Sequence, residues 1–247
     1  MSLIRSLALR CLICTALLVA PHHAAAEAPR ILVLGDSLLA AHSISGRSVS
    51  GRLERYLGQP VRDHSVAGAR MIYNLPITGA MGLSIPKQWR PGRYDWVILN
   101  GGGNDLWLGC GCEACDYKMK RLISDNGRKG SIPGLVGKIR KTGAKVIILG
   151  YLRSPGFSSP IESCKDEGDT LEARLAKLAA LDRGIIFHSI EDLVPHGDLS
   201  FHAMDRIHPS LKASDAIARR LALIIKAEGN PAAGATLRRA KPAAKRH

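Results

Sequence analysis

The chain has 247 residues, and 35 Lys or Arg against 21 Asp or Glu give it a formal net charge of +14. Apolar residues make up 46% and charged residues 23%, a balance that is typical of a globular protein and excludes a fibrous or mostly disordered chain. Aromatic residues make up only 4%, which argues against stacking platforms for single-stranded nucleic acid.

The first 26 residues have the pattern of a secretory signal peptide. Arg5 and Arg10 precede an apolar run from Cys11 to Ala20, and Ala24–Ala26 supplies the small residues of a cleavage site. The apolar run is too short for a membrane span, which needs about 18 residues. We therefore expect cleavage before Glu27 and a periplasmic or secreted bacterial protein with no integral membrane association.

Short apolar runs alternate with amphipathic segments along the rest of the chain. The runs are the candidate strands Ile31–Leu34, Val61–Ser65, Trp96–Leu99, Val146–Leu149 and Ile185–Phe187. The candidate helices are Ser48–Leu57, Ile132–Lys141, Asp169–Leu181 and Leu211–Lys226. Uninterrupted apolar strands suit a parallel sheet that is covered on both faces, so we predict one three-layer α/β/α domain over residues 27–230.

Residues 231–247 hold five basic residues and no acidic one, with much Ala and Pro. This composition predicts a basic, low-complexity, disordered tail. Without the two charges of the signal peptide and the five of the tail, the domain keeps a net charge of +7. The tail could touch anionic surfaces weakly, but the chain has no nucleic-acid-binding motif, so we expect no nucleic-acid partner.

Two polar motifs directly follow candidate strands, at the edge where open α/β sheets bind ligands. Gly35–Leu38 (GDSL) follows the first strand and places Ser37 near the start of a helix. Gly101–Asp105 follows the third strand; its glycines let the backbone approach a ligand, and Asn104 can donate to a developing oxyanion. Taken alone, each motif also describes an ordinary capped turn.

A third motif, Asp205-Arg206-Ile207-His208, stands just before the last predicted helix. A spacing of three lets the Asp205 carboxylate reach Nδ1 of His208, which leaves Nε2 free as a general base. Taken alone, the pair is more simply explained as an Asp and a His at the protein surface. His202 is a rival base, but it lacks an Asp at the matching spacing. Gly68, after the second strand, could present a backbone N–H.

In their order and placement, these motifs resemble the SGNH hydrolases, also called the GDSL esterases and lipases. Four sequence blocks of that family supply Ser, Gly, Asn and His, and here they match Gly35–Leu38, Gly68, Gly102–Asp105 and Asp205–His208. The resemblance implies a flavodoxin-like fold with a mainly parallel five-stranded sheet. One departure is that no glycine stands in the helix start after His208, which concerns packing rather than chemistry.

The resemblance also implies a serine esterase that needs no metal or cofactor. Ser37 would be the nucleophile, His208 the base and Asp205 its orienting partner, with an oxyanion hole made by the Ser37 N–H, the Gly68 N–H and the Asn104 side chain. The substrate would be a small-molecule or cell-envelope ester, which includes thioesters and O-acetyl groups. The alternative is a catalytically idle SGNH-fold protein that binds cell-envelope polysaccharide or lipid.

Side chains after the Asn104 motif could shape this site. Trp107 and Leu108 would line an acyl pocket or, equally well, pack the core under a loop. Four cysteines remain after signal removal: Cys110, Cys112, Cys115 and Cys164. In an exported protein they predict two disulfides, and we favour a bridge from the cluster to Cys164 that fastens two site loops. A four-thiolate zinc site is the alternative, although the cluster lacks paired C-x-x-C spacing.

Overall fold

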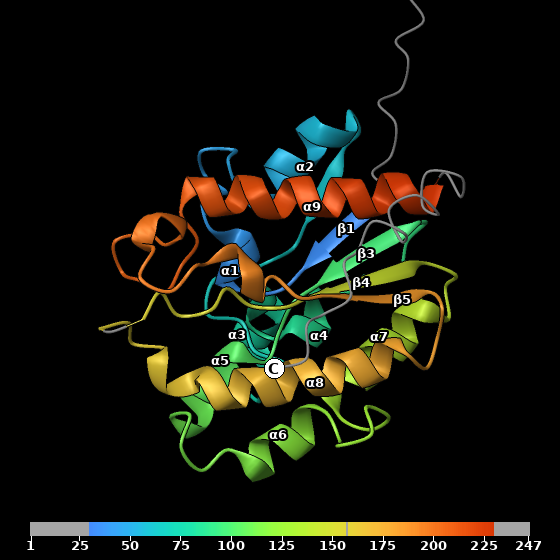
Figure 1. The fold of residues 1–247 in the computed structure, drawn as a ribbon. Helices are drawn as coiled ribbons and strands as arrows, with labels where there is room; N and C mark the ends of the chain where they lie inside the picture. The colour runs from blue at the N-terminus through green and yellow to red at the C-terminus, as the bar shows by residue number, and fades with distance from the viewer. Residues whose placement is uncertain (1–29, 157, 230–247) are drawn as a thin grey trace, which may run out of the picture.

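The computed structural model describes residues 30–156 and 158–229, so the expected signal peptide and tail lie outside the described residues. Figure 1 shows a sheet between two layers of helices. Its strands are β1 (Ile31–Leu34), β2 (Val61–Asp63), β3 (Trp96–Leu99), β4 (Lys145–Leu149) and β5 (Ile185–His188). They pair in parallel in the order β2-β1-β3-β4-β5, which is the flavodoxin-like order. The predicted five-stranded parallel sheet is confirmed.

Alternation along the strands sends side chains into both helical layers. Ile31 and Val33 of β1 pack into one core and Leu32 and Leu34 into the other, because successive strand side chains point to opposite faces. The first core is closed by α1 (Ser37–Ala40), α2 (Val49–Leu57) and α9 (Leu211–Gly229). The second is closed by α5 (Gly103–Cys110), α6 (Asp116–Leu122), α7 (Ser131–Arg140) and α8 (Lys165–Ala179). The predicted three layers are therefore present.

Some elements differ from the sequence-based prediction. β2 ends at Asp63 rather than Ser65, because the Asp63 carboxylate accepts hydrogen bonds from the backbone N–H and the hydroxyl of Ser65 (2.8 and 2.6 Å) and turns the chain. α8 begins four residues earlier than predicted, at Lys165, and its first turn holds acidic side chains that suit a helix N-terminus. Within the described residues, no helix is both long and apolar enough to cross a membrane.

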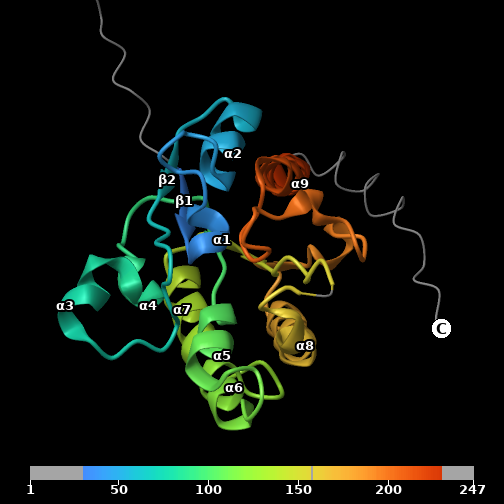
Figure 2. The ribbon, with the colours of Figure 1, turned by 90° about the vertical axis from the view of Figure 1, so that its left-hand side faces the viewer.

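The crossover from β2 to β3 contains short helices that periodicity did not predict. They are α3 (Pro76–Thr78), the π-helical turn Gly79–Leu83 and α4 (Ile85–Gln88). Single 3-10 turns occur at Glu162–Cys164, Glu191–Leu193 and Leu199–Phe201. Figure 2 shows α3 at the outer edge of the molecule, on the side away from α8 and α9.

Candidate active site

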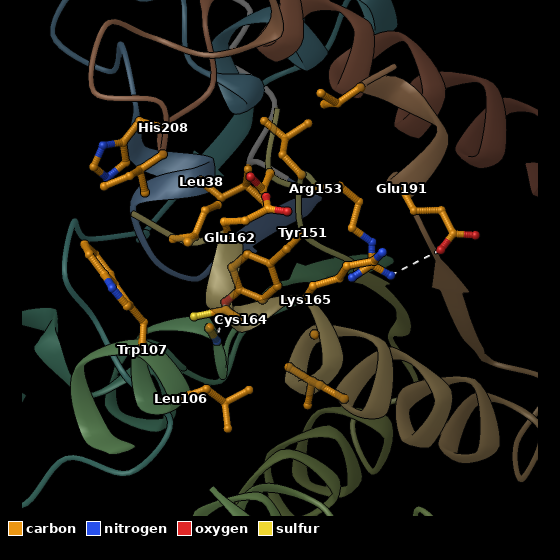
Figure 3. Close-up of a pocket in the computed structure, with 18 of the residues that line it drawn as sticks. Leu38, Leu106, Trp107, Tyr151, Arg153, Glu162, Cys164, Lys165, Glu191 and His208 are labelled. Carbon is orange, nitrogen blue, oxygen red and sulfur yellow. Dashed lines mark hydrogen bonds and ion pairs between the residues drawn. The ribbon is translucent and has the colours of Figure 1, made fainter. Parts of the chain in front are cut away.

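One pocket gathers residues from the ends of several strands. The chain order of the sheet reverses between β1 and β3, and ligands of open α/β sheets bind at such a reversal. The pocket has a volume of about 430 Å³, and Ser37, Asn104 and His208 all line it. Figure 3 shows Trp107 of α5 and His208 on one side of this pocket and Arg153 with Glu191 on the other.

The turn that presents Ser37 is fixed by buried polar groups. A side chain at Gly35 would place its Cβ 1.8 Å from Oδ1 of Asn100, so only glycine fits. The Asn100 amide accepts from the Asp36 N–H (3.1 Å) and donates to the Asp36 carboxylate (2.9 Å). Asp36 also caps α1 by accepting from the N–H of Leu38 (3.0 Å). Ser37, the first residue of α1, therefore follows a turn that Asn100 and the helix cap hold in place.

Tyr151, two residues beyond the end of β4, connects this turn to the start of α5, which holds Asn104. Its hydroxyl donates to the Asp36 carboxyl group (2.6 Å) and accepts from the backbone N–H of Gly103 (3.0 Å). Burial raises the pKa of Asp36, and burial together with the Asp36 carboxyl raises the pKa of Tyr151 well above its usual value. The phenol therefore stays protonated and keeps its donor role. Tyr151 was not predicted from the sequence, although its place after a strand was a usable signal.

The start of α5, with Asn104 and Asp105, is joined in turn to the loop after β2. One N–H of the Asn104 amide donates to the carbonyl of Ala69 (3.1 Å), and the amide has a second N–H for a ligand. Asp105 is buried and accepts from the N–H groups of Met71 and Ile72, both at 2.8 Å. Burial raises the pKa of Asp105 to about 6, against the opposing effect of these hydrogen bonds. Gly68, with a φ of 77°, directly precedes Ala69 in the same turn.

Asp205 and His208 form the pair that their spacing predicts. Oδ2 of Asp205 lies 2.6 Å from Nδ1 of His208, while Oδ1 accepts from the N–H groups of Ile207 and His208, both at 3.0 Å. Partial desolvation opposes ionisation of Asp205, but these hydrogen bonds outweigh it and lower the pKa to about 2. The carboxylate is thus ionised and fixed, which directs Nε2 of His208 away from it.

The structure also places the rival base His202 and the two candidate pocket residues Trp107 and Leu108. His202 is buried and is not among the residues that line the pocket, and burial lowers the pKa of its imidazole. Trp107 lines the pocket, whereas Leu108, one residue further along α5, is 49% exposed and does not. Leu106, on the other side of Trp107 in the sequence, lines the pocket instead, so the lining face of α5 includes Leu106 and Trp107 and leaves Leu108 outside.

The four cysteines form two disulfides, Cys110–Cys115 and Cys112–Cys164. The second is the expected bridge from the cluster to Cys164, and Cys164 itself lines the pocket. It ties the chain after α5 to the segment before α8, which lines the pocket with Ile161, Glu162 and Cys164. The pairing leaves none of the four thiolates free for the zinc alternative.

The wall opposite His208 holds an ion-pair cluster. One Arg153 nitrogen lies 2.8 Å from Asp169, 3.3 Å from Glu172 and 3.1 Å from Glu191. Figure 3 shows the Arg153–Glu191 pair at the pocket edge. Glu172 is buried, which raises its pKa, and it also accepts from the hydroxyl of Ser189 (2.7 Å). The cluster braces the segment after β4 against α8.

Comparison with known proteins shows the family and the fold of the chain. The family model of the GDSL-like lipase/acylhydrolase family matches residues 33–216. The chain belongs to that family and is, by class, a hydrolase of ester bonds. A search of curated proteins found no match.

Solved structures with the same fold include several esterases. The psychrotrophic esterase EstA from Pseudoalteromonas sp. is 17% identical with a TM-score of 0.55, over 81% of this chain and 98% of that one. Est24, a carbohydrate acetylesterase from Sinorhizobium meliloti, is 16% identical with a TM-score of 0.52, over 81% and 99%. A family two carbohydrate esterase from Clostridium thermocellum is 17% identical with a TM-score of 0.55, over 82% and 66%. At these identities the likeness concerns the fold, and it confirms the predicted fold class.

Proposed function

We propose that the protein is an exported serine esterase that hydrolyses carboxylic esters through an acyl-enzyme on Ser37. The observation that carries this proposal is that Ser37 and His208 line one pocket while Asp205 holds Nδ1 of His208 at 2.6 Å. A serine hydroxyl is a weak nucleophile and needs a positioned base of this kind. Asp205 orients the imidazole and stabilises the imidazolium that forms.

The reaction then runs in two halves. Oγ of Ser37 attacks the ester carbonyl carbon while Nε2 of His208 takes its proton, and the same proton passes to the leaving alcohol as the C–O bond breaks. Water repeats the attack on the acyl-serine, His208 again takes and returns a proton, and the carboxylic acid leaves. The N–H groups of Ser37 and Gly68 and the free N–H of Asn104 would receive the oxyanion, each typically worth about 3 kcal/mol of barrier lowering.

The pocket wall favours an acyl chain longer than acetyl. Leu38, Leu106, Trp107, Ile161 and Leu171 line the cavity of about 430 Å³ next to Ser37. Each methylene that is buried against such a wall should raise kcat/KM by roughly fourfold. We therefore expect p-nitrophenyl hexanoate to be cleaved with higher kcat/KM than the acetate. A profile that peaks at acetate would instead favour an O-acetyl substrate.

Export is the second part of the proposal. The two disulfides are typical of proteins that fold in an oxidising compartment. The signal-peptide pattern of the first 26 residues also predicts export. Mass measurement of protein recovered from the expressing bacterium should find a mature chain that begins at Glu27. A chain that retains its first residues would contradict this part alone.

Hydrolysis of p-nitrophenyl esters tests the catalytic part. Ser37→Ala and His208→Ala should each lower kcat by about 10⁴-fold or more, since the groups act as a unit. Ser43→Ala, an exposed serine in the turn after α1, is the matched control and should keep wild-type activity. Hydrolysis that persists in Ser37→Ala would contradict the proposed mechanism, and a wild type that hydrolyses no ester would favour the alternative of an idle SGNH-fold binding protein.

A further inference from the structure

The crossover from β2 to β3 carries an exposed apolar surface. We call residues 64–94 the crossover lobe; it contains α3, the π-helical turn and α4. Leu75, Ile77 and Met81 project from it with 62%, 76% and 74% of their surface exposed. Scattered exposed apolar residues are ordinary, but three in one short segment at the outer edge of the molecule (Figure 2) mark an interaction surface.

The crossover lobe is also basic. It contains Arg70, Lys87, Arg90 and Arg93 and no Asp or Glu. Lys87, Arg90 and Arg93 are exposed, and within the described part of the chain none of these three forms an ion pair. Charge that is not compensated inside the protein attracts an anionic partner.

A hollow of about 390 Å³ joins the apolar and the basic side chains. His64, Lys87 and Arg90 line it together with Met81, whose side chain is also part of the exposed apolar surface. A phosphate that enters this hollow would meet Lys87 and Arg90, while hydrocarbon beside it would meet Met81. Phosphate and hydrocarbon occur side by side at the surface of a phospholipid bilayer.

We propose that the crossover lobe docks the protein onto a bilayer that contains anionic phospholipid. Leu75, Ile77 and Met81 enter the interface, and Lys87 and Arg90 contact the phosphates. An anionic polysaccharide would satisfy the basic side chains but would gain nothing from the exposed apolar ones, so the bilayer fits both observations.

Docking would also place the candidate active site near the membrane. Gln88 lines the hollow, and its side chain accepts from the N–H of Gly35 (2.8 Å) and donates to the carbonyl of Gly35 (2.9 Å). The crossover lobe is therefore held against the turn at Gly35 that precedes Ser37. An ester at the bilayer surface would then lie close to the pocket that Ser37 lines.

Co-sedimentation with phosphatidylcholine vesicles, with and without phosphatidylglycerol, tests the proposal. The protein should bind only the vesicles with phosphatidylglycerol. Replacing Lys87→Gln and Arg90→Gln together should weaken binding about 25-fold, at about fivefold per charge. Replacing Ile77→Ser and Met81→Ser together should weaken it by about tenfold or more. All four side chains lie outside the proposed catalytic machinery, so hydrolysis of a water-soluble ester should stay unchanged and report correct folding.

Matched controls come from the other side of the molecule. Arg183→Gln with Arg219→Gln removes two exposed charges, and Leu223→Ser removes a 51% exposed apolar side chain of α9. These variants should change binding by no more than about twofold. Equal losses in the controls, binding without phosphatidylglycerol, or unchanged binding of the Ile77 and Met81 variant would each overturn the proposal. Vesicle binding should be the same in Ser37→Ala, so this test is independent of the esterase proposal.

Discussion

Tyr151→Phe removes a single oxygen, which connects the turn before Ser37 to the start of α5, where Asn104 lies. The deletion leaves the Asp36 carboxyl and the Gly103 N–H without the partners that they have at 2.6 and 3.0 Å. Each buried polar group that loses its partner costs about 1–3 kcal/mol, so the loss of two partners should lower the free energy of unfolding by about 2–6 kcal/mol. For a domain of this size, at about 2–4 °C per kcal/mol, that is a decrease in Tm of about 4–24 °C.

The same variant should lower kcat more than it changes KM. Gly103 precedes Asn104, and a displacement of about 1 Å at a catalytic group costs up to about 100-fold in rate. Thermal unfolding and steady-state hydrolysis of a p-nitrophenyl ester measure the two effects. Tyr56→Phe is the matched control, because the Tyr56 hydroxyl donates to Asp215 (2.8 Å) between α2 and α9. It should lose about 1 kcal/mol of stability and no activity. If Tyr151→Phe changes kcat by less than twofold, Tyr151 does not position the site.

Three other perturbations have defined outcomes. Because the pKa of Asp105 is raised to about 6, the folded state binds more protons than the unfolded state between about pH 4 and 6, and stability falls as pH rises through that window. Between about pH 4 and 7, urea denaturation should show that the free energy of unfolding of wild type falls by on the order of 3 kcal/mol relative to that of Asp105→Asn. If the two proteins change in parallel with pH, the raised pKa of Asp105 is contradicted. Asp205→Asn should lower kcat about 10³-fold or more through loss of the correct imidazole tautomer, and a loss below tenfold would refute that role. With Asp205 ionised down to about pH 2, the acid limb of kcat/KM in wild type should follow a single proton. Replacing Cys112 and Cys164 by Ser should lower the free energy of unfolding by about 4 kcal/mol, since their disulfide closes a loop of 52 residues. Removal of the Cys110–Cys115 disulfide, which closes a loop of 5 residues, should lower it by about 2 kcal/mol.

The strands and the three short motifs could be read from sequence because their causes are local. A strand such as Trp96–Leu99 is buried on both faces, so its residues form a continuous apolar run. The Asp205–His208 pair depends on a spacing of three within one turn, and the structure has that contact. Gly35 could be recognised from the motif as a turn glycine, but the contact with Asn100 that excludes any side chain there joins distant segments.

Contacts between distant segments could not be read in the same way. Tyr151 and Asp36 are 115 residues apart, and neither has a spacing that relates it to the other. The helices of the crossover lobe have too few buried positions for a periodic pattern; in α3 no residue is buried. α6 buries only Met119 and Leu122, so its amphipathic signal is weak. Which cysteine of the cluster pairs with Cys164 could also be determined only from the fold, which shows that it is Cys112.

Covalent labelling with a fluorophosphonate tests the central claim, that Ser37 is a nucleophile activated by His208. Peptide mapping by mass spectrometry should find one phosphonyl adduct, on the peptide that contains Ser37, with none in Ser37→Ala and much slower labelling in His208→Ala. An adduct on another residue, or equal labelling rates in wild type and His208→Ala, would contradict the proposed mechanism.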